Sequence, residues 1–236
     1  MSTEILIIGA GAAGLIAARE LGKAGKKVIV LEARNRIGGR ILPLDEKEFG
    51  YPAQGGAEWV HGAAPITKGL VKEAHLTLIP EAGEIWSDRS GELSLHESFI
   101  ENNDELKKKL EGLTEDISIF DFLEQNFRDK NDVNFKNSIL KMVEGYDAAD
   151  PKLISTFVLR DEWLSKPSLT QIINDHRIKE GYGALFDFLE DECKRLGVEI
   201  RLNTHVKIIN YTPAGVTIQT DKETLKALKV IITVPL

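Results

Sequence analysis

The segment ILIIGAGAAGLIAARELGKAGKKVIVLEAR, residues 5–34, constrains the fold more than any other part of the chain. Ile5–Ile8 is a short apolar run rich in β-branched residues, which predicts a strand buried on both faces of a parallel sheet. From about Ala12 to Lys23 the apolar residues recur at helical spacing, and Lys27–Leu31 predicts a second strand. The segment therefore predicts a βαβ unit.

Glycines occupy the turn between the first strand and the helix, in the pattern GxGxxG. In such a turn Gly9 allows the sharp bend, Gly11 lets the backbone approach a pyrophosphate, and Gly14 lets the helix pack closely on the sheet. Glu32, at the end of the second strand, is placed to accept hydrogen bonds from a ribose hydroxyl pair. An acidic residue there disfavours a 2′-phosphate, so we expect a dinucleotide other than NADP.

The residues after Glu32 distinguish between NAD and FAD. They read Ala-Arg-Asn-Arg-Ile and continue into Gly38-Gly39-Arg40. A diglycine followed by arginine offers exposed backbone N–H groups and a guanidinium that can bind a second phosphate. An NAD-binding fold does not need this loop, so the pattern favours FAD.

Composition excludes several other classes of protein. The chain has 236 residues and a net charge of −7, which does not fit a nucleic-acid-binding surface. Its single cysteine, Cys193, allows no internal disulfide and fits a cytoplasmic location, and its helical surroundings predict a packing role. We find no signal peptide, no membrane-spanning segment and no metal-ligand spacing.

The remaining chain changes character along its length. Residues 41–64 are rich in Gly and Pro and predict loops, and residues from about 65 to 145 predict mainly helices. Further segments predict helices at 66–74, 103–110, 118–127, 135–143, 154–163 and 181–196, and strands at 198–202, 206–211, 216–220, 224–228 and 229–234.

Three motifs in series, GAGAAG, EARNRIGGR and QGGAEWVHG, resemble the FAD-binding core of the flavin-containing amine oxidases. That family includes monoamine oxidases, polyamine oxidases and histone-demethylase relatives. VEGYDAADPKLISTFVLRDEW and IKEGYGALFDFL are similar to its middle segments, and RLNTHVKIIN and VIITVPL to its returning strands. The resemblance covers essentially the whole chain.

The resemblance implies a set of FAD contacts. It assigns the pyrophosphate to Gly9, Gly11, Ala12, Ala13 and Gly14, the adenosine ribose to Glu32, Ala33 and Arg34, the phosphate and flavin side to Gly38, Gly39 and Arg40, the isoalloxazine ring to Gly55, Gly56, Ala57, Glu58 and Trp59, and the adenine to Val206.

His61, in the WVHG motif, is the one candidate catalytic side chain. In polyamine-oxidase-like relatives this motif places a histidine close to flavin and substrate, which is the first interpretation. The second is a histidine satisfied by hydrogen bonds within its own loop, and both interpretations remain open at this point. Glu58 receives no catalytic role, and Trp59 is expected to pack on the flavin.

The resemblance implies an α/β fold with a Rossmann-like FAD-binding domain, made of a parallel sheet plus a β-meander. The predicted division is 1–75 for the first segment of this domain, 76–180 for an inserted helical part of the substrate domain, and 181–236 for the returning segment. In the family, the VPL segment is followed by a second half that supplies another sheet strand and a lysine near flavin N5. We therefore expect this chain to be the N-terminal half.

The implied activity is oxidation of a C–N bond of a small-molecule amine by hydride transfer to flavin N5, with O2 reoxidising the flavin to give H2O2. The alternatives are a flavin desaturase or protoporphyrinogen-oxidase-like enzyme, and an FAD-binding fragment without activity alone. The WVHG and DAADP motifs favour the amine oxidase. We expect self-association or a companion C-terminal chain to cover the open sheet edge.

Overall fold

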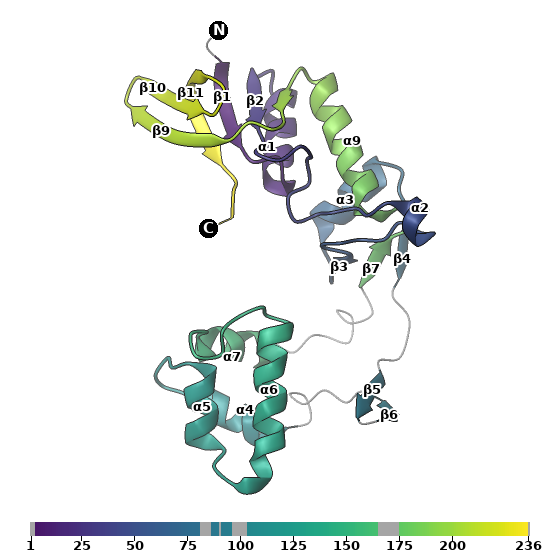
Figure 1. Cartoon of the computed structure of the whole chain (residues 1–236), viewed down its shortest axis with the longest axis vertical. Helices are drawn as coiled ribbons and strands as arrows, with labels where there is room; N and C mark the ends of the chain where they lie inside the picture. Colours follow the sequence, from purple (N-terminus) through teal and green to yellow (C-terminus); the bar gives the residue numbers. More distant parts are fainter. Residues whose placement is uncertain (1–2, 81–85, 90, 96–102, 165–174, 236) are drawn as a thin grey trace. The chain divides into compact units, whose positions relative to one another are not determined.

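The computed structural model describes residues 3–80, 86–89, 91–95, 103–164 and 175–235. It forms two compact units, unit 1 (Met1–Glu81 with Thr170–Leu236) and unit 2 (Ala82–Leu169) (Figure 1). The predicted boundaries fell after residues 75 and 180, whereas the two units divide after Glu81 and after Leu169. The reason is that β4 (Leu78–Pro80) and β7 (His176–Ile178), which lie inside the predicted helical segment, pair with each other in unit 1.

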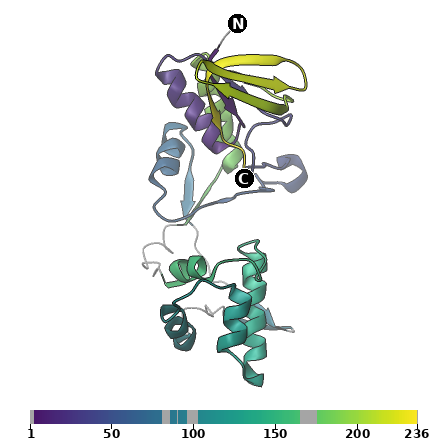
Figure 2. The ribbon, with the colours of Figure 1, turned by 90° about the vertical axis from the view of Figure 1, so that its left-hand side faces the viewer.

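A six-stranded sheet forms the centre of unit 1, in the order β8-β2-β1-β11-β10-β9. Its strands are β1 (Thr3–Ile8), β2 (Val28–Leu31), β8 (Glu199–Arg201), β9 (Val206–Thr212), β10 (Gly215–Thr220) and β11 (Thr224–Ile232). The first four strands in that order run parallel, and β11, β10 and β9 form an antiparallel meander, drawn in yellow and yellow-green in Figure 2. The predicted parallel sheet plus meander is confirmed.

Strand β11 corrects one sequence prediction, because residues 224–228 and 229–234 were expected to form two strands. They form one, since its first part pairs with β10 and its later part pairs with β1, so no turn is needed between them. Pairing with β10 ends at Ala227. Among the described residues, no strand pairs with Lys229–Ile232 on that side, so the sheet has an open edge there.

Both faces of strand β1 are buried, as its apolar run predicts. Ile5 and Ile7 pack on one face against α1 (Ala12–Lys23) and α9 (Gly181–Arg195), while Leu6 and Ile8 pack on the other against the meander. Removing each such side chain from water contributes about 1.5–3 kcal/mol to folding.

A buried arginine joins the helices of unit 1. Arg19 of α1 is only 5% exposed and pairs with Glu73 at the end of α3 (Pro65–Glu73) and with Glu192 of α9. Its guanidinium also lies 5.6 Å from the centre of the Phe188 ring. These contacts tie three helices together at a site where an unpaired charge would be costly.

The predicted loop region 41–64 contains two short elements, α2 (Glu46–Phe49) and β3 (Trp59–Val60). Strand β3 pairs with β7, and β7 with β4, to form a second, three-stranded sheet in unit 1. This small sheet carries the WVHG motif.

Unit 2 is mainly helical, as the sequence predicts. Its elements are β5 (Trp86–Arg89), β6 (Glu92–Leu95), α4 (Asp104–Glu111), α5 (Ile119–Asn126), η1 (Lys130–Asp132), α6 (Val133–Gly145) and α7 (Thr156–Leu164). Ser118 caps α5 as expected, because its hydroxyl accepts a hydrogen bond from the Asp121 amide at 3.1 Å. The hairpin of β5 and β6 was not predicted. Within the described segments, no helix combines the length and apolar character needed to cross a membrane.

Candidate cofactor and substrate site

The glycine loop joins β1 to α1 in a turn too tight for larger residues. Gly9 has φ +103°, and a Cβ on Gly14 would lie 1.9 Å from the Gly9 carbonyl oxygen. Thr233, just after β11, donates from its hydroxyl to the Ile8 carbonyl at 2.9 Å. Thr233 lies within the VIITVPL motif, but its role towards the glycine loop was not predicted from the sequence.

The N-terminus of α1 is open to a ligand. Its N-cap residue, Gly11, makes no side-chain capping bond, and its first turn contains no acidic residue. Ala12 and Ala13 are exposed. Uncapped amides at a helix N-terminus carry partial positive charge, so this end of α1 suits a phosphate group.

The buried side chain of Glu32 connects the glycine loop to the segment that follows β2. Its side chain accepts hydrogen bonds from the Ala10 amide at 2.8 Å and the Arg34 amide at 2.9 Å. A carboxylate has about four acceptor positions, so capacity remains for a ribose hydroxyl. The Thr204 amide donates to the Glu32 carbonyl at 2.8 Å, which brings the start of β9 and Val206 to this edge of the sheet.

The diglycine lies directly against the glycine loop. Gly38 donates its amide to the Ala10 carbonyl at 2.9 Å, and a Cβ on Gly39 would lie 3.4 Å from the Gly11 Cα. Arg34 and Arg36 both donate to the Gly39 carbonyl, and Arg36 also donates to Ile41. These bonds stiffen the loop.

Arg40 has a different environment from Arg34 and Arg36. It is exposed next to the diglycine, in a position where its guanidinium can meet an anion. The structure therefore brings the predicted phosphate-contacting segments together. It also distinguishes the roles of two arginines, since Arg36 braces the loop from inside while Arg40 is exposed.

The GGAEW segment packs along the loop of residues 33–42, called the arginine loop here because it carries Arg34, Arg36 and Arg40. A Cβ on Gly56 would lie 2.0 Å from the Arg40 carbonyl oxygen, and the Gly55 amide donates to Leu42 at 2.7 Å. The Ala57 amide also donates to Arg40, at 3.3 Å. The predicted flavin-ring segment and the predicted phosphate segment are thus neighbours in space.

Trp59 is covered by a cation from the paired strand β7. The Arg177 guanidinium lies 3.9 Å from the centre of the Trp59 ring and 3.3 Å from the Glu58 carboxylate. The Tyr182 hydroxyl donates to the Trp59 carbonyl at 3.2 Å. These contacts set the orientation of the indole ring.

His61 follows β3, and its Nδ1 lies 2.9 Å from the Asp175 carboxylate. The Gly62 amide donates to the other oxygen of Asp175 at 2.8 Å. Burial opposes ionisation of Asp175, but the bonds from Gly62 and His61 outweigh it and hold the pKa of this carboxyl below its ordinary value. The His61 side chain remains 67% exposed. Sequence reasoning missed Asp175, which lies far away along the chain.

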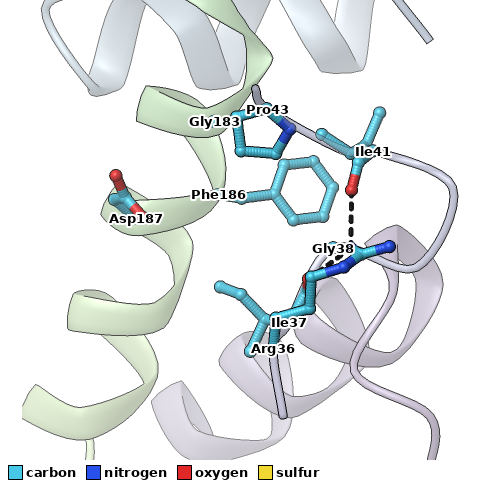
Figure 3. Close-up of a pocket in the computed structure, with 8 residues that line it drawn as sticks. All are labelled: Arg36, Ile37, Gly38, Ile41, Pro43, Gly183, Phe186 and Asp187. Atoms are coloured by element: carbon cyan, nitrogen blue, oxygen red, sulfur yellow. Dashed lines mark hydrogen bonds between the residues drawn. The ribbon is translucent and has the colours of Figure 1, made fainter. Parts of the chain in front are cut away.

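A pocket of about 160 Å³ lies between the arginine loop and α9 (Figure 3). The Phe186 ring and Pro43 line it, while the Arg36 guanidinium turns to the Ile41 carbonyl. Ligand pockets usually measure about 300–1,000 Å³, so we interpret this pocket as a packing gap behind the loop.

Cys193 packs inside unit 1, as predicted. It is fully buried, its thiol lies 3.5 Å from the Leu15 carbonyl, and burial raises its pKa to about 11. A thiol held protonated in this way is not a nucleophile at neutral pH. Over the part of the chain that the structure describes, no group of His, Cys, Asp or Glu side chains is arranged to hold a metal ion.

The model of one family, described as flavin containing amine oxidoreductase, matches residues 12–236 of the chain. The chain belongs to the flavin-containing amine oxidoreductase family. Within this family the glycine loop, Glu32 and the arginine loop have a ready explanation, since the family name itself implies a flavin.

Two relatives in this family align with 99% of the chain, each at 28% identity: lysine-specific histone demethylase 1B of Mus musculus and polyamine oxidase 4 of Oryza sativa subsp. japonica. The chain covers 30% of the first and 51% of the second. A probable polyamine oxidase 4 of Arabidopsis thaliana is 42% identical over 84 residues, which is 34% of this chain and 16% of that protein.

Solved structures share the fold. A putrescine oxidase double mutant has a TM-score of 0.74 at 24% identity, with coverage of 100% of this chain and 58% of that one. Cyclohexylamine oxidase of Brevibacterium oxydans IH-35A has a TM-score of 0.77 at 18% identity, with coverage of 99% and 58%. The chain therefore spans at most about six tenths of these relatives.

Proposed function

We propose that the chain binds FAD and forms part of an amine oxidase that oxidises a C–N bond. Hydride would pass from the carbon beside the nitrogen to flavin N5, and O2 would be reduced to H2O2 as it reoxidises the flavin. One observation carries the proposal. Hydrogen bonds and close backbone contacts connect the glycine loop, Glu32, the diglycine and the GGAEW segment into one continuous surface. The family match and the open N-terminus of α1 support the same assignment.

Each part of that surface has a task in the proposal. The amides at the start of α1 and the guanidinium of Arg40 bind the pyrophosphate, and Glu32 accepts from the adenosine ribose. Trp59, braced by Arg177, lies along the flavin ring and excludes water. When bound, the flavin supplies the acceptor for electrons from the carbon beside the amine nitrogen.

The substrate class in the proposal is a small amine. We take this substrate class from the names of the relatives, which include polyamine and putrescine oxidases. Activity in the proposal belongs to a longer or complemented protein, since the chain spans only part of its relatives. A partner segment would cover the open edge of β11.

The test begins with FAD reconstitution of the purified chain. We expect a yellow protein whose flavin fluorescence is quenched on binding. Glu32→Ala should weaken FAD binding by about 10–100-fold, because a hydrogen bond to a charged group contributes about 1.5–3 kcal/mol. Glu111→Ala, an exposed residue of α4 in unit 2, is the matched control and should bind as the wild type does.

Anaerobic addition of putrescine or another amine then tests the reaction class. Bleaching of the flavin absorbance, reversed by O2, is the expected result. A colourless chain that cannot be reconstituted would overturn FAD binding. A yellow chain that no amine bleaches, even with the remaining family segments supplied in trans, would overturn the amine oxidase assignment.

A further inference from the structure

His61 and Asp175 share one face of the small sheet with Trp59. Strands β3 and β7 pair Trp59 with Arg177 and Val60 with His176, and this register continues outward to His61 and Asp175. Side chains alternate along a strand, so His61 and Asp175 lie on the face of Trp59 and Arg177. Val60 points the opposite way and is buried in the main core.

The charge state of Asp175 decides which nitrogen of His61 carries the proton. The pKa of Asp175 is held below its ordinary value, so the group is a carboxylate at neutral pH and can only accept hydrogen bonds. It lies 2.9 Å from Nδ1 of His61, so Nδ1 must be the donor. In the neutral ring, Nε2 is then the nitrogen with the free lone pair.

The loop around this pair is fixed at several points. Asp175 uses its second oxygen for the Gly62 amide, and the Lys68 ammonium donates to the Gly62 carbonyl at 2.8 Å. Gly62 has φ +60°, a conformation that glycine adopts without strain. The backbone that carries His61 is therefore held together with its ring, and the ring stays two-thirds exposed beyond this contact.

We propose that Asp175 is the positioning residue of this site, which fixes His61 in the Nδ1–H form and directs Nε2 towards the substrate amine. This inference rests on the proposed function, since Trp59 on the same face is our assigned neighbour of the flavin ring. With its lone pair outward, Nε2 can accept a hydrogen bond or a proton from an ammonium group and leave the amine neutral for oxidation. Glu58 and Arg177 are charged neighbours on this sheet, and the titratable His176 lies next to Asp175.

The tautomer can be measured without flavin or substrate. We would label the histidines with ¹⁵N, assign His61 by its loss in His61→Gln, and record long-range ¹H–¹⁵N spectra of the whole chain above neutral pH. The wild type should show Nδ1 protonated and Nε2 unprotonated. In Asp175→Asn the amide can keep the Gly62 bond with its oxygen and present N–H to the ring, so the proton should move to Nε2.

A second histidine–aspartate pair in unit 1 supplies the control. His205 Nδ1 lies 3.4 Å from Asp221, so Asp221→Asn should change the signals of His205 and leave those of His61 as they are. Unchanged thermal unfolding of Asp175→Asn would show that the variant is folded, and Asp175→Glu, which restores a carboxylate, should restore the Nδ1–H form. Wild-type His61 with Nδ1 unprotonated, or a tautomer indifferent to Asp175→Asn, would overturn the proposal.

The catalytic consequence needs the flavin-loaded, complemented protein. Asp175→Asn should lower kcat/KM for an amine by about 10-fold or more, with FAD affinity unchanged. The loss should stay below the roughly 10²–10⁴-fold that an acid–base group itself contributes, because Asp175 acts only through His61. Full activity in a variant with the shifted tautomer would overturn the link to catalysis. If no variant or wild type oxidises amines, the proposed function fails, while the tautomer spectra still decide the role of Asp175 towards His61.

Discussion

At the scale of single residues, the site depends on positions where any side chain would collide with backbone. Gly14 and Gly56 are the clearest cases, since a Cβ would come within 1.9 Å and 2.0 Å of a carbonyl oxygen. No rotamer can relieve such a collision, because the atom it meets belongs to the main chain. The glycines therefore set how closely loop, helix and sheet approach each other.

Gly14→Ala should destabilise unit 1 by more than about 3 kcal/mol, because it forces α1 away from the turn after β1. Gly69→Ala is the matched control, since Gly69 also lies in a helix but has open space around its Cα. The control should stabilise the protein by about 0.5–1 kcal/mol through helix propensity. Thermal or urea unfolding of both variants measures the contrast, and equal stability of the two would refute the packing argument.

At the scale of elements, β11 is the strand whose pairing is incomplete. Its first part, Thr224–Ala227, pairs with β10, while Lys229–Ile232 pairs with β1 on one side only within the described structure. Ile232 in this stretch is 56% exposed, and Leu228, just before it, is 65% exposed. Unpaired backbone groups beside exposed apolar side chains favour association with another strand.

We therefore expect the isolated chain to associate as its concentration rises, with an apparent mass above 26.2 kDa in light scattering. Ile232→Lys places a charge at the open edge and should shift the chain towards the monomer. Val158→Lys, at an exposed apolar position of α7 in unit 2, should behave as the wild type does. A clean monomer at every concentration would contradict this expectation.

At the scale of the whole molecule, carboxylates hold segments together that are distant in sequence. A hydrogen bond from Arg195 and the charge of Arg19 lower the pKa of Glu192, and a hydrogen bond from Arg201 lowers that of Glu199. Bonds from Gly62 and His61 do the same for Asp175, against the effect of its burial. Glu192 joins α1 to α9 through Arg19, and Asp175 holds the WVHG loop, whereas the pair of Glu199 and Arg201 lies within β8 itself.

Because the folded-state pKa values of these groups lie below their unfolded values, their stabilisation is complete above the unfolded values, about 3.9 for Asp and 4.3 for Glu. It is lost as the pH falls through the lower, folded-state values. Asp147 acts in the opposite sense, since burial raises its pKa. We expect the net effect to be a falling melting temperature below about pH 4.5.

Glu192→Gln should flatten this acid dependence. Glutamine is neutral at every pH, so its contacts with Arg19 and Arg195 do not change as the pH falls. Glu111→Gln, at an exposed position, should leave it unchanged. Melting curves between pH 3 and pH 7 compare the two. A pH profile of Glu192→Gln identical to that of the wild type would count against the ion pairs as its source.

The local elements of the fold could be predicted because their signals are local. A continuous apolar run predicted β1, helical spacing of apolar residues predicted α1, and the βαβ order predicted β2. A serine in capping position predicted the start of α5. The division of β11 into two strands was wrong, because its two halves have different partners and look like separate strands when the chain is considered alone. The loop at 41–64 concealed β3, which is too short to leave a pattern.

By itself, the sequence determined the βαβ unit, the glycine loop with its acidic partner Glu32, and the family resemblance, since each depends on residues close together along the chain. Only the tertiary structure decided that Asp175 meets His61, that Arg177 covers Trp59 and that Thr233 braces the glycine loop. These pairs come from segments more than a hundred residues apart. Folding of the two sheets brings them into contact, and spacing along a single segment cannot encode that proximity.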